Sequence, residues 1–229
     1  MKILVVIPAF NEAENIRDVI RDLKEYFPEG KYLIINDGSI DETSSVSASL
    51  EARVINLPYN VGIGGAVQTG FIIAEKEGYD AVIQFDGDGQ HMAQYIKKIL
   101  AALDENTDIV IGSRFLEIEG YKMPFLRKFG AQIFSSIMSG LCRTGLTDTT
   151  AGFRAYGKRA IKLFSIYYPE DYPEVEALIL ARKKKLAIKE VAVQMRQRLK
   201  GKSSITPLRS IYYMIKVLLA VFVDLLKRY

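Results

Sequence analysis

Two aspartates separated by a single residue are the strongest chemical signal in the sequence. Asp86 and Asp88 follow an apolar run at residues 81–85, which predicts a buried strand that ends where the pair begins. Carboxylates placed in this way can converge on a divalent cation, and their hard oxygens suit Mg²⁺ or Mn²⁺. Gly87 and Gly89 leave room for a phosphate beside such an ion. Because two acidic residues in a loop are more often only solvated, it is their place at a strand end that favours a metal site.

Polar residues also follow other apolar runs. Asp37 comes directly after residues 32–36 and could accept hydrogen bonds from a nucleobase or a ribose. Asp41 and Thr43 are expected to cap the next helix and to keep the loop in shape. The stretch at residues 60–65 lacks the ending of an ATP-binding loop and the spacing of a dinucleotide fingerprint, so it indicates neither ATP nor NAD. It predicts instead that a helix N-terminus approaches a nucleoside closely.

These residues need a scaffold that brings strand ends together, and the sequence alternates in the way this requires. Apolar runs predict strands at residues 3–7, 32–36, 53–56, 81–85 and 108–111. Helical spacing predicts helices at residues 11–27, from about 41, at 64–77 and at 92–103. The alternation predicts an α/β fold with a doubly wound, mostly parallel sheet, in which ligands bind beyond the carboxyl ends of the strands.

After Arg114 the alternation is expected to stop. The sequence predicts a helix at residues 125–141, a loop at 148–154, a helix at 175–184 and a strand at 188–195. The final segment, from residue 207 onward, has the pattern of a mostly apolar helix.

Composition indicates one folded domain. The chain has 229 residues, of which 49% are apolar and 25% charged, as in an ordinary globular protein. Lys and Arg are concentrated at residues 182–185 and 196–202, a pattern that suits phosphate groups or an anionic membrane, or that is simply a solvated face. Cys142 is the single cysteine, so no internal disulfide forms and a reducing compartment fits. Residues 1–10 indicate a strand and not a signal peptide.

Several motifs together resemble a known family. In chain order they are Pro8-Ala9-Phe10-Asn11-Glu12, Asn36-Asp37-Gly38-Ser39 with Asp41 and Thr43, Asn60-x-Gly62, Asp86-Gly87-Asp88-Gly89-Gln90-His91, and Gly112-Ser113-Arg114. This order resembles the family 2 glycosyltransferases, which have a Rossmann-like GT-A fold. Within them the chain is similar to the polyprenyl-phosphate glycosyltransferases, the group of dolichol-phosphate mannose synthase. The resemblance spans essentially the whole chain.

The resemblance implies where a nucleotide-sugar donor and its metal bind. The donor nucleotide would contact Pro8, Asn11, Glu12, Asp37, Asn60, Gly62 and Asp86. Asp86, Asp88 and Gln90 would hold Mg²⁺ or Mn²⁺. His91, the only histidine, would orient a ligand or only pack behind the metal site. The chain has Asn36 where the family usually has an acidic residue, which removes a carboxylate contact to the base.

The same resemblance implies how charge on the diphosphate and on the acceptor is met. Arg196 to Ser203 resembles a basic loop that closes over the donor diphosphate, so Arg198 would act with Asp86 and Asp88 in catalysis. An acceptor phosphate is expected near Arg114, Arg127, Thr150, Lys202 and Ser203. Thr150 replaces the usual serine and keeps its hydroxyl, whereas Ser204 replaces a usual basic residue.

The implied function is metal-dependent, inverting transfer of a hexose from a UDP- or GDP-sugar to undecaprenyl or dolichyl phosphate, for cell-envelope glycan synthesis. One alternative is a transferase that acts directly on a cell-wall or surface polysaccharide. An alternative of another class is a nucleotidyltransferase, although the glycine-rich basic loop of those enzymes is replaced here by Asn11 and Glu12.

The domain expectation is a catalytic domain at residues 1–204 and a C-terminal amphipathic helix at 205–229. That helix would dock on a membrane surface or on a partner, either a second copy of the chain or a small membrane protein. Lys216 and Asp224 argue against a spanning helix. The expected location is therefore peripheral, on the cytoplasmic face of the cell membrane, with no nucleic-acid partner.

Overall fold

A computed structural model describes residues 1–50, 52–116, 145–170, 172–196 and 216. The predicted helix at residues 125–141 and the tail at 205–229 lie outside these residues, except for residue 216 of the tail. The elements in chain order are β1 (Ile3–Ala9), α1 (Ile16–Tyr26), β2 (Lys31–Asn36), α2 (Thr43–Ser49), β3 (Arg53–Asn56), α3 (Gly62–Lys76), β4 (Ala81–Gln84), η1 (Ala93–Tyr95), α4 (Ile96–Ala101), β5 (Ile109–Ser113), β6 (Arg154–Gly157), α6 (Lys158–Ile166), α7 (Pro173–Lys183) and β7 (Ile188–Ala192).

The strands of the described residues form one seven-stranded sheet in the order β3-β2-β1-β4-β6-β5-β7. β6 runs antiparallel to β4 and to β5, and the other pairs are parallel. The α/β fold with a mostly parallel sheet is therefore confirmed. The expectation that the alternation stops after Arg114 is wrong, because β6 and α6 continue it and the predicted loop at residues 148–154 ends where β6 begins.

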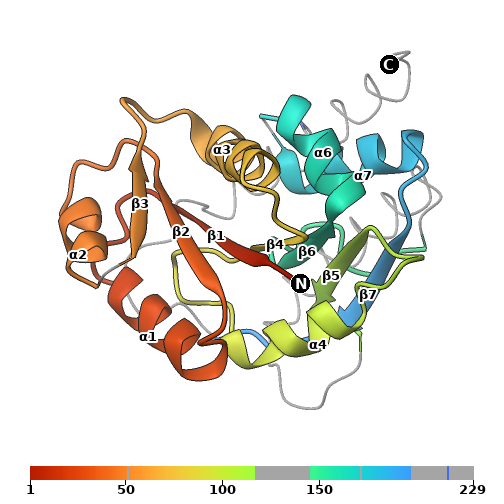
Figure 1. The fold of residues 1–229 in the computed structure, drawn as a ribbon, viewed down its shortest axis with the longest axis horizontal. Coiled ribbons are helices and arrows are strands. Elements are labelled where there is room, and N and C mark those ends of the chain that lie inside the picture. The colour runs from red at the N-terminus through yellow and green to blue at the C-terminus, as the bar shows by residue number, and fades with distance from the viewer. Residues whose placement is uncertain (51, 117–144, 171, 197–215, 217–229) are drawn as a thin grey trace.

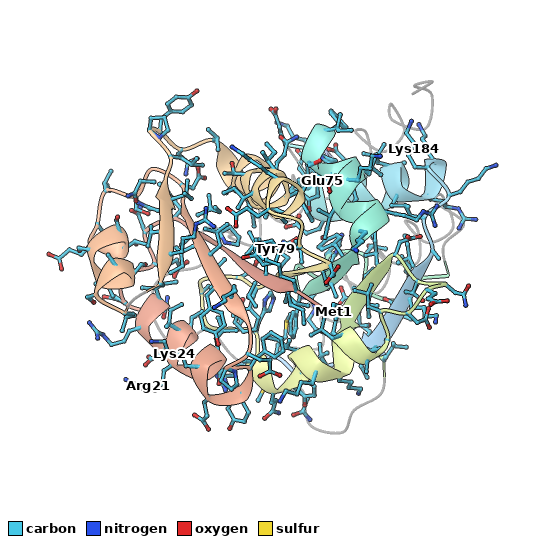
Figure 2. The ribbon with its side chains drawn as sticks, in the orientation of Figure 1. Met1, Arg21, Lys24, Glu75, Tyr79 and Lys184 are labelled. Atoms are coloured by element: carbon cyan, nitrogen blue, oxygen red, sulfur yellow. The ribbon has the colours of Figure 1, made fainter. Side chains whose placement is uncertain are left out.

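Helices cover both faces of the sheet, which is why β1 and β4 read as continuous apolar runs. Figure 1 shows α3, α6 and α7 on one side and α1, α2 and α4 on the other. Each side has its own buried apolar cluster. Arg21 and Lys24 project from the outer side of α1, whereas Tyr79, which is 7% exposed, lies among interior side chains (Figure 2).

Close contact between α3 and the sheet depends on Gly70. A Cβ at this position would lie 2.3 Å from Cγ1 of Val6 in β1, so a larger side chain would push the helix away from the sheet.

At the far edge of the sheet, Lys189 of β7 pairs with Asp104 at 2.7 Å. The hydrogen bond from Lys189, followed by that from Thr107, lowers the pKa of Asp104 to about 2.

Some element bounds differ from those predicted. α1 begins at Ile16 and not near Asn11, because Asn11 adopts a left-handed backbone conformation with φ 56°, which a helix cannot continue through. β5 ends at Ser113, two residues beyond the predicted strand at residues 108–111. Among the described residues no helix has the length and apolar character needed to cross a membrane.

Candidate active site

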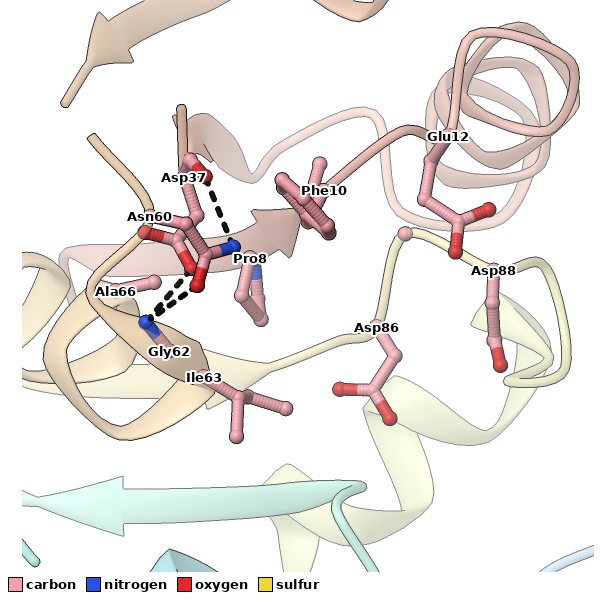
Figure 3. A pocket seen from close by; sticks show the side chains of 12 residues that line it. Pro8, Phe10, Glu12, Asp37, Asn60, Gly62, Ile63, Ala66, Asp86 and Asp88 are labelled. Carbon is pink, nitrogen blue, oxygen red and sulfur yellow. Dashed lines mark hydrogen bonds between the residues drawn. The ribbon is translucent and has the colours of Figure 1, made fainter. Parts of the chain in front are cut away.

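A pocket opens beyond the carboxyl ends of β1, β2 and β4, the edge where the sequence predicts a ligand. Figure 3 shows Glu12, Asp86 and Asp88 on one side of it and Asp37, Asn60 and Gly62 on the other. The lining residues are Pro8, Ala9, Phe10, Glu12, Asp37, Asn60, Gly62, Ile63, Ala66, Asp86, Gly87 and Asp88. Six of the seven positions expected to contact the donor nucleotide are among them. Asn11 is not, since its side-chain oxygen accepts a hydrogen bond from the backbone N–H of Ile40 at 3.0 Å.

Asp86 and Asp88 lie in the segment between β4 and η1, residues 85–92, which we call the acidic loop. Oδ1 of Asp86 is buried and has no hydrogen-bond partner among the described residues. Burial, followed by the charge of Asp88, raises the pKa of Asp86 to about 7. Glu12 adds to this effect. A cation between these carboxylates would remove both penalties, so the residues present fit a divalent metal.

The described residues do not form a complete metal site by themselves. They contain no group of three or more His, Cys, Asp or Glu side chains arranged to hold an ion. Gln90, expected as a third ligand, does not line the pocket, and its backbone N–H donates to Oδ1 of Asp88 at 3.0 Å. Mg²⁺ and Mn²⁺ sites of this kind are commonly completed by water and substrate phosphates.

Asp37 holds the start of α3 in place. Its Oδ1 accepts from the N–H of Val61 at 2.7 Å and its Oδ2 from the N–H of Gly62 at 3.0 Å. The carboxylate therefore satisfies N–H groups that a helix start leaves unpaired, and its charge lies favourably at the positive end of the helix. The sequence suggested a contact to the nucleoside for Asp37 but gave no sign of this support of α3.

The loop after β1 and the loop after β2 are joined by hydrogen bonds to the side chains of Asp41 and Thr43. Asp41 accepts from the N–H of Ala13 at 3.1 Å, and Oγ1 of Thr43 accepts from the N–H of Glu12 at 2.8 Å. The expectation that they keep the loop in shape is confirmed. Asp41 also caps the start of α2 as expected, since its Oδ1 accepts from the N–H of Thr43, the first residue of that helix, at 2.9 Å. Thr43 itself lies inside α2 and is not its cap.

His91, near the end of the acidic loop, packs behind Asp86 and does not line the pocket. It is 3% exposed and its ring stacks on Phe153, with centroids 4.9 Å apart. Its Nδ1 accepts from the N–H of Asp86 at 3.0 Å, and its Nε2 lies 3.4 Å from Oδ2 of Asp86. Burial lowers the pKa of His91 to about 4. A neutral imidazole with its proton on Nε2 fits both contacts and orients Asp86.

Gly152 and Arg154 lie behind Asp86 and were not expected there. A Cβ at Gly152 would lie 2.9 Å from Oδ2 of Asp86. Arg154 is 1% exposed and donates to the backbone oxygens of Ala151 and Thr149. Its charge partly offsets the raised pKa of Asp86. The sequence predicted only a loop at residues 148–154, and the burial of Arg154 could not be read from it.

Two residues expected at an acceptor phosphate, Arg114 and Thr150, lie side by side. Nη2 of Arg114 donates to Oγ1 of Thr150 at 2.8 Å. Arg114 also forms a bidentate ion pair with Asp148 through Nε and Nη2, both at 2.7 Å. The carboxylate of Glu190 on β7 accepts from the N–H groups of Thr147 and Asp148 and so fixes this loop. The other expected residues, Arg127, Arg198, Lys202 and Ser203, lie outside the described residues.

Comparison with known proteins gives consistent results. A family model described as "Glycosyl transferase family 2" matches residues 4–164. The chain is 33% identical over 213 residues to UDP-N-acetylglucosamine--dolichyl-phosphate N-acetylglucosaminyltransferase of Methanococcus voltae, with 84% of each chain covered. It is 34% identical over 180 residues to undecaprenyl-phosphate mannosyltransferase of Micrococcus luteus, with 72% of each covered.

A solved structure shares the fold at low sequence identity. Glucosyl-3-phosphoglycerate synthase of Mycobacterium tuberculosis, in complex with Mn²⁺, uridine diphosphate and glucosyl-3-phosphoglycerate, is 17% identical and gives a TM-score of 0.70. The match covers 97% of this chain and 79% of that chain.

Proposed function

Because the chain belongs to glycosyl transferase family 2 and is a glycosyltransferase, we propose that it moves a hexose from a UDP- or GDP-sugar to a polyprenyl phosphate such as undecaprenyl or dolichyl phosphate. The names of the relatives from Methanococcus voltae and Micrococcus luteus support the lipid acceptor. The family match over residues 4–164 speaks against the nucleotidyltransferase alternative.

The observation that carries the donor side of this proposal is the state of Asp86. Its buried Oδ1 lacks a partner among the described residues, its pKa is raised to about 7, and it lines a pocket at the ligand-binding edge of the sheet. Asp86 and Asp88 would hold Mg²⁺ or Mn²⁺ with the donor phosphates. When bound, such a cation stabilises the negative charge that develops on the leaving diphosphate.

The acceptor side needs charge and position more than it needs a base. A phosphate oxygen of the lipid attacks the anomeric carbon, and the bond from that carbon to the diphosphate oxygen breaks with its electron pair left on the diphosphate. A single displacement of this kind inverts the anomeric centre. Since a lipid phosphate is already an anion at neutral pH, no general base is required. Arg114 and Thr150 are proposed to bind that phosphate, together with Arg127, Lys202 and Ser203.

The proposed location is the cytoplasmic face of the membrane, with residues 205–229 docked on lipid or on a partner. This placement would let a lipid phosphate reach the pocket. Binding of the full chain and of a chain ending at residue 204 to anionic liposomes tests it, because loss of binding on truncation is expected and equal flotation of both would contradict it.

Product analysis tests the proposed reaction. The full chain with Mn²⁺ is given radiolabelled UDP- and GDP-sugars, each with undecaprenyl or dolichyl phosphate, and we expect label in an acid-labile lipid fraction. Asp88→Ala should abolish this transfer without lowering the melting temperature, whereas Glu29→Ala, in an exposed ion pair with Lys97, should leave it intact. Label found only in polysaccharide, or full turnover of Asp88→Ala at saturating Mn²⁺, would overturn the proposal.

A further inference from the structure

Asp22 lies outside the donor pocket, but its carboxylate contacts two residues that adjoin the acidic loop, Ala93 and Arg196. It belongs to α1 and is 8% exposed. Its Oδ2 accepts from the N–H of Ala93 at 2.9 Å, at the start of η1, and its Oδ1 accepts from Nη2 of Arg196 at 2.7 Å. Both oxygens of this buried carboxylate are therefore used by residues far away in the sequence.

Arg196 extends the contact back to the acidic loop. Its backbone N–H donates to the backbone oxygen of Gln90 at 2.9 Å. Asp22 thus holds the chain directly at Ala93 and, through Arg196, at Gln90. The pair lines a small cavity with Asp88 and Gly89, and Asp88 also lines the donor pocket.

The acidic loop needs such support from outside. Gly89 has φ 76°, and glycines give a backbone more freedom than other residues do. Inside the loop, the N–H of Asp86 donates to His91 and the N–H of Gln90 to Asp88. The N–H groups of Phe85 and Gly87 donate to the backbone oxygens of Val6 and Pro8 in β1, so β1 holds the first half of the loop and the contacts of Arg196 and Asp22 hold the second half. The neighbouring charges of Asp86 and Asp88 also repel each other.

We infer that Asp22, acting with Arg196, is a positioning residue that fixes the acidic loop and so sets the affinity of Asp86 and Asp88 for the divalent cation. The inference rests on the proposed metal-dependent function. Residues that orient metal ligands without touching the ion commonly contribute about 10- to 100-fold to affinity. The lower figure applies here because Asp22 acts through the backbone of the loop.

Arg196→Ala separates positioning from simple electrostatics. Removing a positive charge near two metal-binding carboxylates should tighten Mn²⁺ binding if charge alone matters. Removing an anchor of the loop should weaken it. For Asp22→Asn both effects have the same sign, because the change removes a negative charge and an acceptor together. The arginine variant is therefore the decisive one.

The experiment measures Mn²⁺ binding to the full-length chain at saturating UDP or GDP, so that a change in nucleotide affinity does not decide the result, by electron paramagnetic resonance of the free ion. We expect about tenfold weaker binding for Asp22→Asn and for Arg196→Ala, and no greater loss in the double variant, since both changes remove one interaction. Glu29→Gln, which breaks an exposed ion pair with Lys97, serves as the control and should bind like the wild type. Thermal unfolding of each variant shows that it is folded.

Three results would count against the inference. Arg196→Ala that binds Mn²⁺ as tightly as the wild type, or more tightly, overturns it and leaves the proposed function standing. Losses that simply add in the double variant also overturn it. Wild-type protein that binds no Mn²⁺ with either nucleotide sinks the proposed metal dependence, and the inference with it. If Asp22→Asn does not fold, Arg196→Ala alone decides.

Discussion

Gly152→Ala should damage catalysis while leaving the fold intact, because the added methyl group meets the carboxylate of Asp86. An ideal Cβ at Gly152 would lie 2.9 Å from Oδ2 of Asp86, whereas ordinary contact begins at 3.4 Å. The carboxylate must therefore move by about 0.5 Å, the limit of what catalytic geometry tolerates. A misplacement of about 1 Å can cost about 100-fold. We expect kcat/KM for sugar transfer to fall about tenfold, which corresponds to about 1.4 kcal/mol of transition-state stabilisation.

The same substitution should change the free energy of unfolding by no more than about 1 kcal/mol, because Gly152 has no left-handed backbone conformation that alanine would strain. Gly78→Ala is the matched control. Gly78 has φ 67°, and a Cβ added there would meet nothing within 4 Å, so alanine should cost about 1–2 kcal/mol of stability and leave kcat/KM unchanged. Wild-type kcat/KM in Gly152→Ala at saturating Mn²⁺ would refute the placement of the reaction beside Asp86.

Three further predictions concern the scaffold. Asp148→Asn should lower the free energy of unfolding by about 3 kcal/mol in chemical denaturation, because a neutral amide replaces the buried carboxylate that pairs with the guanidinium of Arg114; a loss below about 1 kcal/mol would show that this pair is not needed. Gly70→Ala should cost about 1–3 kcal/mol by pushing α3 off β1, and unchanged stability would mean that the helix shifts freely. Asp104→Asn should be less stable than the wild type at neutral pH, and the gap should close as pH falls from about 4 toward about 2. The hydrogen bond from Lys189 lowers the pKa of Asp104 in the folded protein to about 2. Its contribution to stability is therefore fully present above the pKa of the unfolded chain and is lost as pH falls through the pKa of the folded protein. A gap that stays constant with pH would contradict this assignment.

Sequence patterns predicted the first five strands well. Four of them, β1, β2, β4 and β5, are largely buried apolar runs, as strands covered on both faces must be, whereas β3 lies at the sheet edge and is only partly buried. The edge of the sheet at which a ligand binds could be predicted from these strands, since parallel strands bring their carboxyl ends to one side. β6 was missed for a physical reason. Its residues, Arg154–Gly157, are few and begin with a charged side chain, which is typical of a loop. That charge is buried only because backbone oxygens of the preceding turn accept its hydrogen bonds.

The support of the site was less visible than its lining. Asp37 and Asp86 stand out in the sequence because they follow strands. Asp22 looks like an ordinary polar position of an amphipathic helix, and its partners Ala93 and Arg196 are distant in the chain. A contact of this kind is created by tertiary packing, so no local spacing reveals it.

The position of β6 in the sheet has a consequence for synthesis on the ribosome. The strands β1 to β4 can pair as soon as residue 84 has emerged, since β3-β2-β1-β4 are neighbours. β5 is made next, but both of its neighbours, β6 and β7, come later in the chain. A nascent chain that has emerged as far as residue 150 therefore exposes the apolar strand Ile109–Ser113 with no partner in the sheet. Aggregation during translation should be most severe while the emerged part of the chain ends between residues 113 and 157, and a pause in synthesis at that stage would favour it.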